Sequence, residues 1–117
     1  MKLISEQPSI TQEEGTHIIG FLNSKSGEYF MIQWCLEYTP QDEKLGIDTY
    51  YIERNDQNNS CYGGIEKIEL EDGGLIIHLS PKAIQYLKAS TLEITWEPDE
   101  TSYQELIKNF DILLKQI

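Results

Sequence analysis

The side chains with the most varied chemistry lie close together in residues 50–65, which read YYIERNDQNNSCYGGI. Carboxylates, amides, phenols and a thiol of these types can bind a metal ion, transfer protons or contact another protein. The aromatic and β-branched residues 49–53 predict a strand. The polar residues 55–60 predict an exposed turn, because their side chains compete with the backbone for hydrogen bonds. The segment therefore predicts a strand, a turn and a second strand.

A calcium site is the first interpretation to test, because Asp56, Asn58 and Ser60 place oxygen atoms at alternate positions. A calcium-binding loop of this kind needs glycine at its sixth position and glutamate at its twelfth. Here those positions hold Cys61 and Lys67. The match fails, and we expect neither a metal site nor a cofactor.

Catalytic motifs are equally hard to find. The chain has no zinc-hydrolase, nucleophile-elbow or phosphate-binding-loop motif. Glu53 and Asp56 are a candidate acid–base pair, but acidic pairs arise by chance in a chain with 20 Asp and Glu residues. His17 and His78 fall in different predicted strands, and a hydrogen-bonded or surface histidine is the simpler interpretation of each. We therefore expect no catalytic residues and no enzyme.

The cysteines and the first residues bear on the compartment. Cys35 and Cys61 lack C-x-x-C spacing, and Glu6 and Pro8 stand where a signal peptide would need an apolar core. Free thiols and a cytoplasmic location are expected, since reducing compartments keep cysteines unpaired. No run of the sequence approaches the roughly 18 apolar residues of a membrane span.

The chain is strongly acidic, with 9 Lys and Arg residues against 20 Asp and Glu residues and a formal net charge of −11. Such a charge repels phosphate backbones and anionic lipids. Direct binding to nucleic acid or to a membrane is therefore not expected. The charge serves either solubility or a partner with a basic surface, and charge alone favours solubility as the simpler of the two.

Alternating patterns predict the first strands. Residues 16–22 and 28–38 predict an antiparallel pair joined by a turn at residues 23–27. The core face of the second strand is expected to hold Phe30, Ile32, Trp34, Leu36 and Tyr38. The opposite face then holds Tyr29, Gln33, Cys35 and Glu37. Residues 39–48 contain a proline and a glycine among charged residues, which predicts the longest loop.

The second half adds a hairpin, two helices and a strand. Asp72-Gly73 between residues 65–70 and 75–79 is typical of a hairpin turn. Ser80-Pro81 predicts the start of a short helix that ends near Ala89, and residues 92–96 predict a strand. A capping box at Thr101 and Gln104 predicts a final helix. Seven apolar residues of that helix are spaced to face the sheet: Tyr103, Leu106, Ile107, Phe110, Leu113, Leu114 and Ile117.

Strands that precede helices are typical of an α+β domain. We expect a mostly antiparallel sheet that begins as an N-terminal meander, with the short and the long C-terminal helix packed on one face. The other face should be exposed and acidic. Residues 1–117 are expected to form a single domain, with residues 1–14 as a loosely ordered tail or an edge strand.

Recognition of another protein is the function that residues 50–65 suit best. Tyr51 and Tyr62 offer rigid contact area at low entropic cost, and the acids and amides offer directed hydrogen bonds. Gly63-Gly64 allows another backbone to come near. The structural alternative is a hairpin whose tyrosines pack into the sheet and whose glycines form a bulge. Residue types alone do not separate the two.

Residues 50–70, YYIERNDQNNSCYGGIEKIEL, resemble the immunity protein 10 family of bacterial polymorphic-toxin systems. The resemblance rests on the tyrosine and glutamate of the strand, the Asp56-Gln57 pair and the Tyr62-Gly63-Gly64 step, and it extends from about Trp34 to the C-terminal helix. It implies a non-catalytic inhibitor that binds a cognate toxin domain and so protects the cytoplasm. The family positions would be Tyr51, Glu53, Asp56, Gln57, Tyr62, Gly63 and Gly64.

The mechanistic hypothesis is that the acidic sheet surface and residues 55–60, Asn58 included, cover a basic site on the toxin, such as that of a nuclease. One alternative is a self-associating structural domain, which would bury its tyrosines and edge strands in a symmetric contact. Another is a small hydrolase that uses Glu53 or His78. A hydrolase would bring those side chains together in a concave pocket, whereas an inhibitor should present a flat or convex acidic face.

Overall fold

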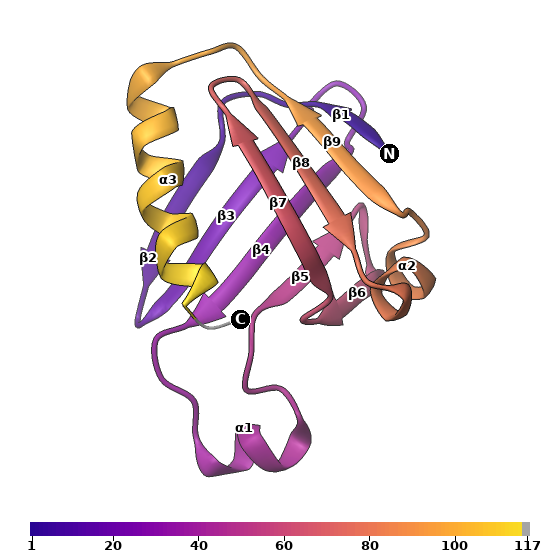
Figure 1. The fold of residues 1–117 in the computed structure, drawn as a ribbon, viewed down its shortest axis with the longest axis vertical. Coiled ribbons are helices and arrows are strands. Elements are labelled where there is room, and N and C mark those ends of the chain that lie inside the picture. Colours follow the sequence, from indigo (N-terminus) through magenta and orange to yellow (C-terminus); the bar gives the residue numbers. More distant parts are fainter. Residues whose placement is uncertain (116–117) are drawn as a thin grey trace.

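The computed structural model describes residues 1–115, which form nine strands and three helices (Figure 1). Five strands pair in the order β2-β3-β4-β5-β6 and are all antiparallel: β2 (Ser9–Glu13), β3 (Thr16–Leu22), β4 (Tyr29–Cys35), β5 (Tyr51–Arg54) and β6 (Asp56–Tyr62). Four strands pair in the order β1-β9-β8-β7, and only the β1–β9 pair among them is parallel: β1 (Lys2–Ile4), β9 (Thr91–Thr95), β8 (Gly74–Leu79) and β7 (Ile65–Glu71). The α+β class and the mostly antiparallel pairing are confirmed.

The strands divide into two sheets, where the sequence pattern suggested one. In β3, β4, β8 and β9 every second residue is buried, and all of these residues except His17 belong to one hydrophobic cluster. The rings of Phe21 on β3 and Trp96 after β9 lie 5.5 Å apart and join the two layers. Each large apolar side chain buried in this way contributes about 1.5–3 kcal/mol. The two sheets therefore cover each other's apolar faces and leave their outer faces exposed.

The C-terminal helices fill the ends of this core. α2 (Pro81–Leu87) begins at Ser80, whose hydroxyl accepts from the Ala83 amide, so the predicted start is confirmed. α3 (Glu100–Leu114) lies over β2 and β3 at the other side of the fold (Figure 1). Its cap is Asp99, which accepts from the Ser102 amide, so the predicted capping box was wrong because Asp99 supplies an earlier cap.

The final helix buries only part of its predicted apolar face. Leu106, Phe110 and Leu113 are buried, whereas Leu114 is 49% exposed. Ile117 lies outside the described residues. The helix is amphipathic as expected, with its exposed residues on the side away from the core.

Residues 39–48 contain a helix, so the prediction of a loop was wrong. α1 (Pro40–Leu45) carries a full capping box, in which Thr39 Oγ1 accepts from the Asp42 amide at 3.1 Å and Asp42 Oδ2 accepts from the Thr39 amide at 2.9 Å. Gly46 ends it with a left-handed φ of 73°. These local caps stabilise a helix that buries no residue. α1 projects beyond the ends of β4 and β5 (Figure 1).

Residues 55–60 were predicted to be a turn, but all except Asn55 belong to the edge strand β6. Asn55 alone makes the reversal, with a φ of 61°. A register shift at Glu53/Arg54 accommodates the extra residues of β6. β6 is an edge strand, so its backbone pairs with β5 on one side only. Its polar side chains are tolerated because most of them are exposed.

Two further expectations change at strand ends. β4 ends at Cys35, so Leu36 is 53% exposed and Tyr38 does not join the core. At the N-terminus, residues 1–14 contain edge strands, because β1 and β2 each lie at the edge of a sheet.

The predicted hairpin at Asp72-Gly73 is confirmed by the β7–β8 pairing. None of the helices in residues 1–115 has the length and apolar character needed to span a membrane.

Candidate partner-binding site

The outer face of the five-stranded sheet carries most of the residue types that the sequence singled out. Phe30, Ile32 and Ile52 point into the core, so the residues that alternate with them on β4, β5 and β6 point outward. The strand register arranges these outward residues in two rows. One row is Gln33, Tyr51 and Tyr62, and the next is Met31, Glu53 and Ser60.

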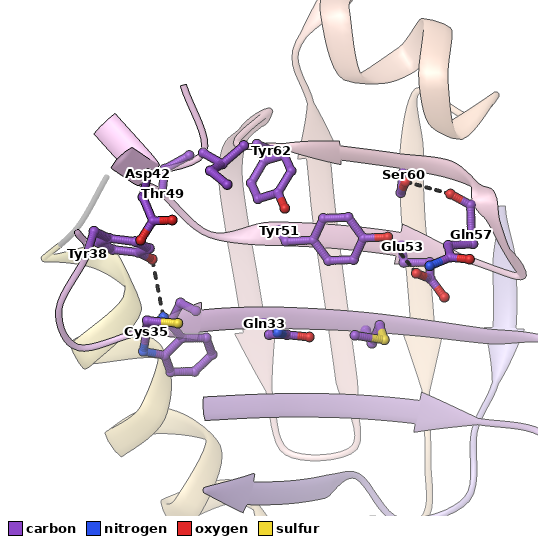
Figure 2. A pocket seen from close by; sticks show the side chains of 13 residues that line it. Gln33, Cys35, Tyr38, Asp42, Thr49, Tyr51, Glu53, Gln57, Ser60 and Tyr62 are labelled. Carbon is purple, nitrogen blue, oxygen red and sulfur yellow. Dashed lines mark hydrogen bonds between the residues drawn. The ribbon is translucent and has the colours of Figure 1, made fainter. Parts of the chain in front are cut away.

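A hollow of about 560 Å³ opens on this face, beside α1 (Figure 2). It is lined by Met31, Gln33, Trp34, Cys35, Tyr38, Asp42, Ile47, Thr49, Tyr51, Glu53, Gln57, Ser60 and Tyr62. Large tyrosine rings and the segment that carries α1 stand around shorter side chains such as Ser60 and Thr49. The face is therefore concave at this place, and the expectation of a flat or convex surface was wrong.

Glu53 lies at the centre of a hydrogen-bonded group in the hollow. The Tyr51 hydroxyl donates to Glu53 Oε1 at 2.6 Å (Figure 2), and the Tyr29 hydroxyl donates to Glu53 Oε2. Tyr29 comes from β4, so the carboxylate joins two strands. Since each oxygen accepts a phenol, the side chain of Glu53 is held in one orientation.

The carboxylate changes the titration of both phenols. The hydrogen bond to Glu53 raises the pKa of Tyr29 to about 12, with burial as a smaller cause. Burial raises the pKa of Tyr51, and its hydrogen bond to Glu53 adds to the effect. A donated hydrogen bond favours the protonated phenol. Both tyrosines therefore remain hydrogen-bond donors at neutral pH.

We expect Glu53→Gln to lower the pKa of Tyr29 toward the ordinary tyrosine value of about 10. The folded pKa of about 12 lies above that of an unfolded chain, so the stability contributed by Tyr29 is complete below pH 10 or so and is lost as the pH rises through the folded value. NMR titration of the tyrosine rings measures this pKa. Glu93→Gln, on the other sheet, is the control that should leave it unchanged. A wild-type Tyr29 that titrates near 10 would contradict the arrangement.

The hollow is negatively charged without compensation. Its ionisable acids are Asp42 and Glu53, and no Lys, Arg or His lines it. Within residues 1–115, the carboxylates that form ion pairs are Glu69 and Glu93, on the other sheet. Arg54 follows Glu53 in sequence but points to the opposite side, where its Nη1 donates to the Leu87 carbonyl at 2.8 Å. A cation that enters the hollow would therefore meet carboxylates without competing side-chain cations.

The structure places the predicted site residues in three groups. Tyr51, Glu53, Gln57 and Tyr62 line the hollow. Asp56 and Asn58 lie beside it at the exposed start of β6, where Asp56 Oδ1 accepts from the Asn58 amide. Gly63 and Gly64 lie outside the hollow, in the connection from β6 to β7 that links the two sheets.

The sequence did not predict several residues of the hollow. Gln33 and Cys35 of β4 were predicted on the face opposite the core, but nothing local indicated that β4 pairs with β5. Asp42 could have been found from its capping box with Thr39, which predicts a helix in the supposed loop. The lining residues not predicted as site residues are Met31, Gln33, Trp34, Cys35, Tyr38, Asp42, Ile47, Thr49 and Ser60.

The remaining candidates for chemistry lie apart from the hollow. His78 Nε2 is 2.7 Å from Glu69 on the outer face of the four-stranded sheet, so His78 and Glu53 do not converge. His17 is buried and stacks on Trp34 with 5.2 Å between ring centroids. Cys35 and Cys61 are thiols that are not joined in a disulfide, as expected. In the part of the chain that the structure describes, no group of three or more His, Cys, Asp or Glu residues is placed to hold a metal ion.

Comparison with known proteins identifies the family. The model of the family described as immunity protein 10 matches residues 6–104, a range that includes α1 and every residue of the hollow. No curated protein and no solved structure matches the chain. The match spans most of the 117 residues, so the chain belongs to the immunity protein 10 family.

Proposed function

We propose that this chain neutralises a cognate toxin domain by covering a basic site of the toxin with the outer face of the five-stranded sheet. Membership of the immunity protein 10 family indicates an immunity protein. The observation that carries the proposal is the hollow, in which tyrosines surround Glu53 and Asp42 and no cation balances them. This is the complement of a basic, partly apolar surface.

A nuclease is the class of toxin that suits this surface best. Proteins that bind nucleic acid need Lys and Arg on their surface to neutralise phosphates. An inhibitor with a net charge of −11 is attracted to such a surface over a long range. Once in contact, part-exposed aromatic side chains such as Tyr62, 39% exposed, supply the area that slows dissociation.

Inhibition by contact, without catalysis, fits the geometry of Glu53. Both oxygens of Glu53 accept phenols, and His78, the other side chain considered for a hydrolase, lies on the other sheet. A hydrolase would need these groups to meet at one substrate atom. The arrangement therefore favours a protein that inhibits the toxin by binding to it, without a catalytic step.

The proposal is tested by Tyr62→Ala and Asp56→Ala, measured as affinity for the toxin domain encoded by the adjoining gene. Each substitution should weaken binding by about 1–3 kcal/mol if the residue is a hot spot. Tyr86→Ala is the matched control, because Tyr86 is 48% exposed on α2, which packs on the buried side of β6. Unchanged affinity in both Tyr62→Ala and Asp56→Ala would remove this face from the interface.

The electrostatic part of the proposal has its own test. Raising the ionic strength from about 0.01 M to about 0.15 M shortens the Debye length from about 30 Å to about 8 Å. We expect the association rate constant to fall steeply over this range, while the dissociation rate constant changes much less. Stopped-flow mixing measures both constants. An association rate indifferent to salt would reject steering by charge.

A further inference from the structure

We infer that the hollow is a socket for the guanidinium group of one arginine side chain of the toxin. This inference rests on the proposed function and names the group that the outer face recognises. It is carried by three features of the hollow: a pair of tyrosine rings, a carboxylate held between two phenols, and a set of amide and hydroxyl groups around them.

The aromatic wall of the socket is the Tyr51–Tyr62 pair. These residues are direct partners on β5 and β6, and their rings lie 5.3 Å apart at an interplanar angle of 55°. Tyr62 is 39% exposed, so part of its surface is open to a ligand. A guanidinium group stacks on such a ring through cation–π attraction and planar contact.

The charged group of the socket is Glu53. Each of its oxygens accepts one phenol, and a carboxylate oxygen can accept a second hydrogen bond. The side chain is partly buried, which weakens screening by solvent. Because Tyr29 and Tyr51 already fix its orientation, a cation that binds Glu53 does not have to order it.

The shape of the hollow favours arginine over lysine. Gln33 on β4 lies opposite Tyr51, and Ser60 on β6 lies opposite Glu53, so an amide and a hydroxyl group flank the Tyr51–Glu53 strand. Arginine presents five N–H donors in a plane, whereas lysine presents three from one point. A hollow with an aromatic wall and several acceptors therefore uses the planar guanidinium group more fully.

The inference is tested on the full chain by NMR titration with three capped tripeptides, Gly-Arg-Gly, Gly-Lys-Gly and Gly-citrulline-Gly, at low ionic strength. Citrulline keeps the planar shape of arginine and lacks its charge. We expect shifts at Tyr51, Glu53 and Tyr62 with the arginine peptide, weaker binding of the lysine peptide and none of the citrulline peptide. Glu53→Gln and Tyr62→Ala should each lower the affinity for the arginine peptide by roughly tenfold. Glu93→Gln, on the other sheet, should not.

Other outcomes overturn the socket. Equal binding of the citrulline peptide, equal binding of the lysine peptide, or shifts centred on Glu69 and Glu93 would each do so. Loss of toxin binding in Tyr62→Ala, with no arginine-dependent shift at Glu53, would overturn the socket and leave the proposed function standing. Arginine-dependent shifts at Glu53, with toxin affinity unaffected by Tyr62→Ala and Asp56→Ala, would retain an arginine site and overturn the proposed function.

Discussion

Glu53→Lys is expected to lower the affinity for the cognate toxin by roughly a thousandfold, about 4 kcal/mol. The substitution places a cation where a basic toxin surface would bring its own, in a hollow whose other ionisable acid is Asp42. It also removes the acceptor of the Tyr29 and Tyr51 hydroxyls. Isothermal titration calorimetry of the two purified proteins measures the change.

The matched control for this charge reversal is Glu93→Lys. Glu93 lies on β9, on the outer face of the four-stranded sheet, where its partner Lys2 is 3.9 Å away. The change in net charge is the same in both variants, so long-range attraction falls equally. We expect less than about a tenfold loss of affinity for Glu93→Lys, since only long-range steering is reduced. Equal losses in the two variants would mean that net charge alone determines binding.

Gly64→Ala is expected to lower the free energy of unfolding by about 3 kcal/mol, through overpacking and backbone strain together. A Cβ atom at position 64 would lie 2.5 Å from the Cβ of Ala83 in α2, and the φ of Gly64 is +97°. The chain crosses from one sheet to the other at this glycine, and its carbonyl accepts from the Ser80 amide. Neither the backbone nor α2 is therefore free to move away. Urea denaturation followed by circular dichroism measures the loss.

Gly63→Ala separates the two causes. Gly63 also has a positive φ, +72°, but a Cβ there would approach nothing nearer than the Thr49 Cγ2 atom at 3.9 Å. Only the backbone penalty should remain, about 1 kcal/mol. If both substitutions cost the same, the close approach to Ala83 contributes nothing. This pair of variants also tests whether the Gly-Gly step acts by supporting the fold.

Elements with strong local signals could be predicted from the sequence. The alternation in residues 28–35, the Asp72-Gly73 turn and the Ser80-Pro81 helix start each act within a few residues. β6 could not be predicted, because its polar side chains favour a turn and its strand conformation depends on pairing with β5. The second sheet was missed for a related reason, since alternation shows which face is buried and does not show what covers it.

The candidate site could be predicted in part. The residue types of Tyr51, Glu53, Gln57 and Tyr62 indicated an interface, and all four line the hollow. The register that sets Gln33 beside Tyr51 and Met31 beside Glu53 depends on contacts between distant parts of the chain. The local sequence therefore predicted which side-chain types β5 and β6 present. The concave shape depends on the pairing of β5 with β4 and on the position of α1, which local sequence does not determine.

The most direct test of toxin binding through this face is hydroxyl-radical footprinting of the complex. Tyr62 and Tyr86 are exposed tyrosines, at 39% and 48%, on opposite sides of β6. We predict that the toxin protects Tyr62 and Met31 from oxidation and leaves Tyr86 as reactive as in the free protein. Protection of Tyr86 with Tyr62 unchanged would contradict it.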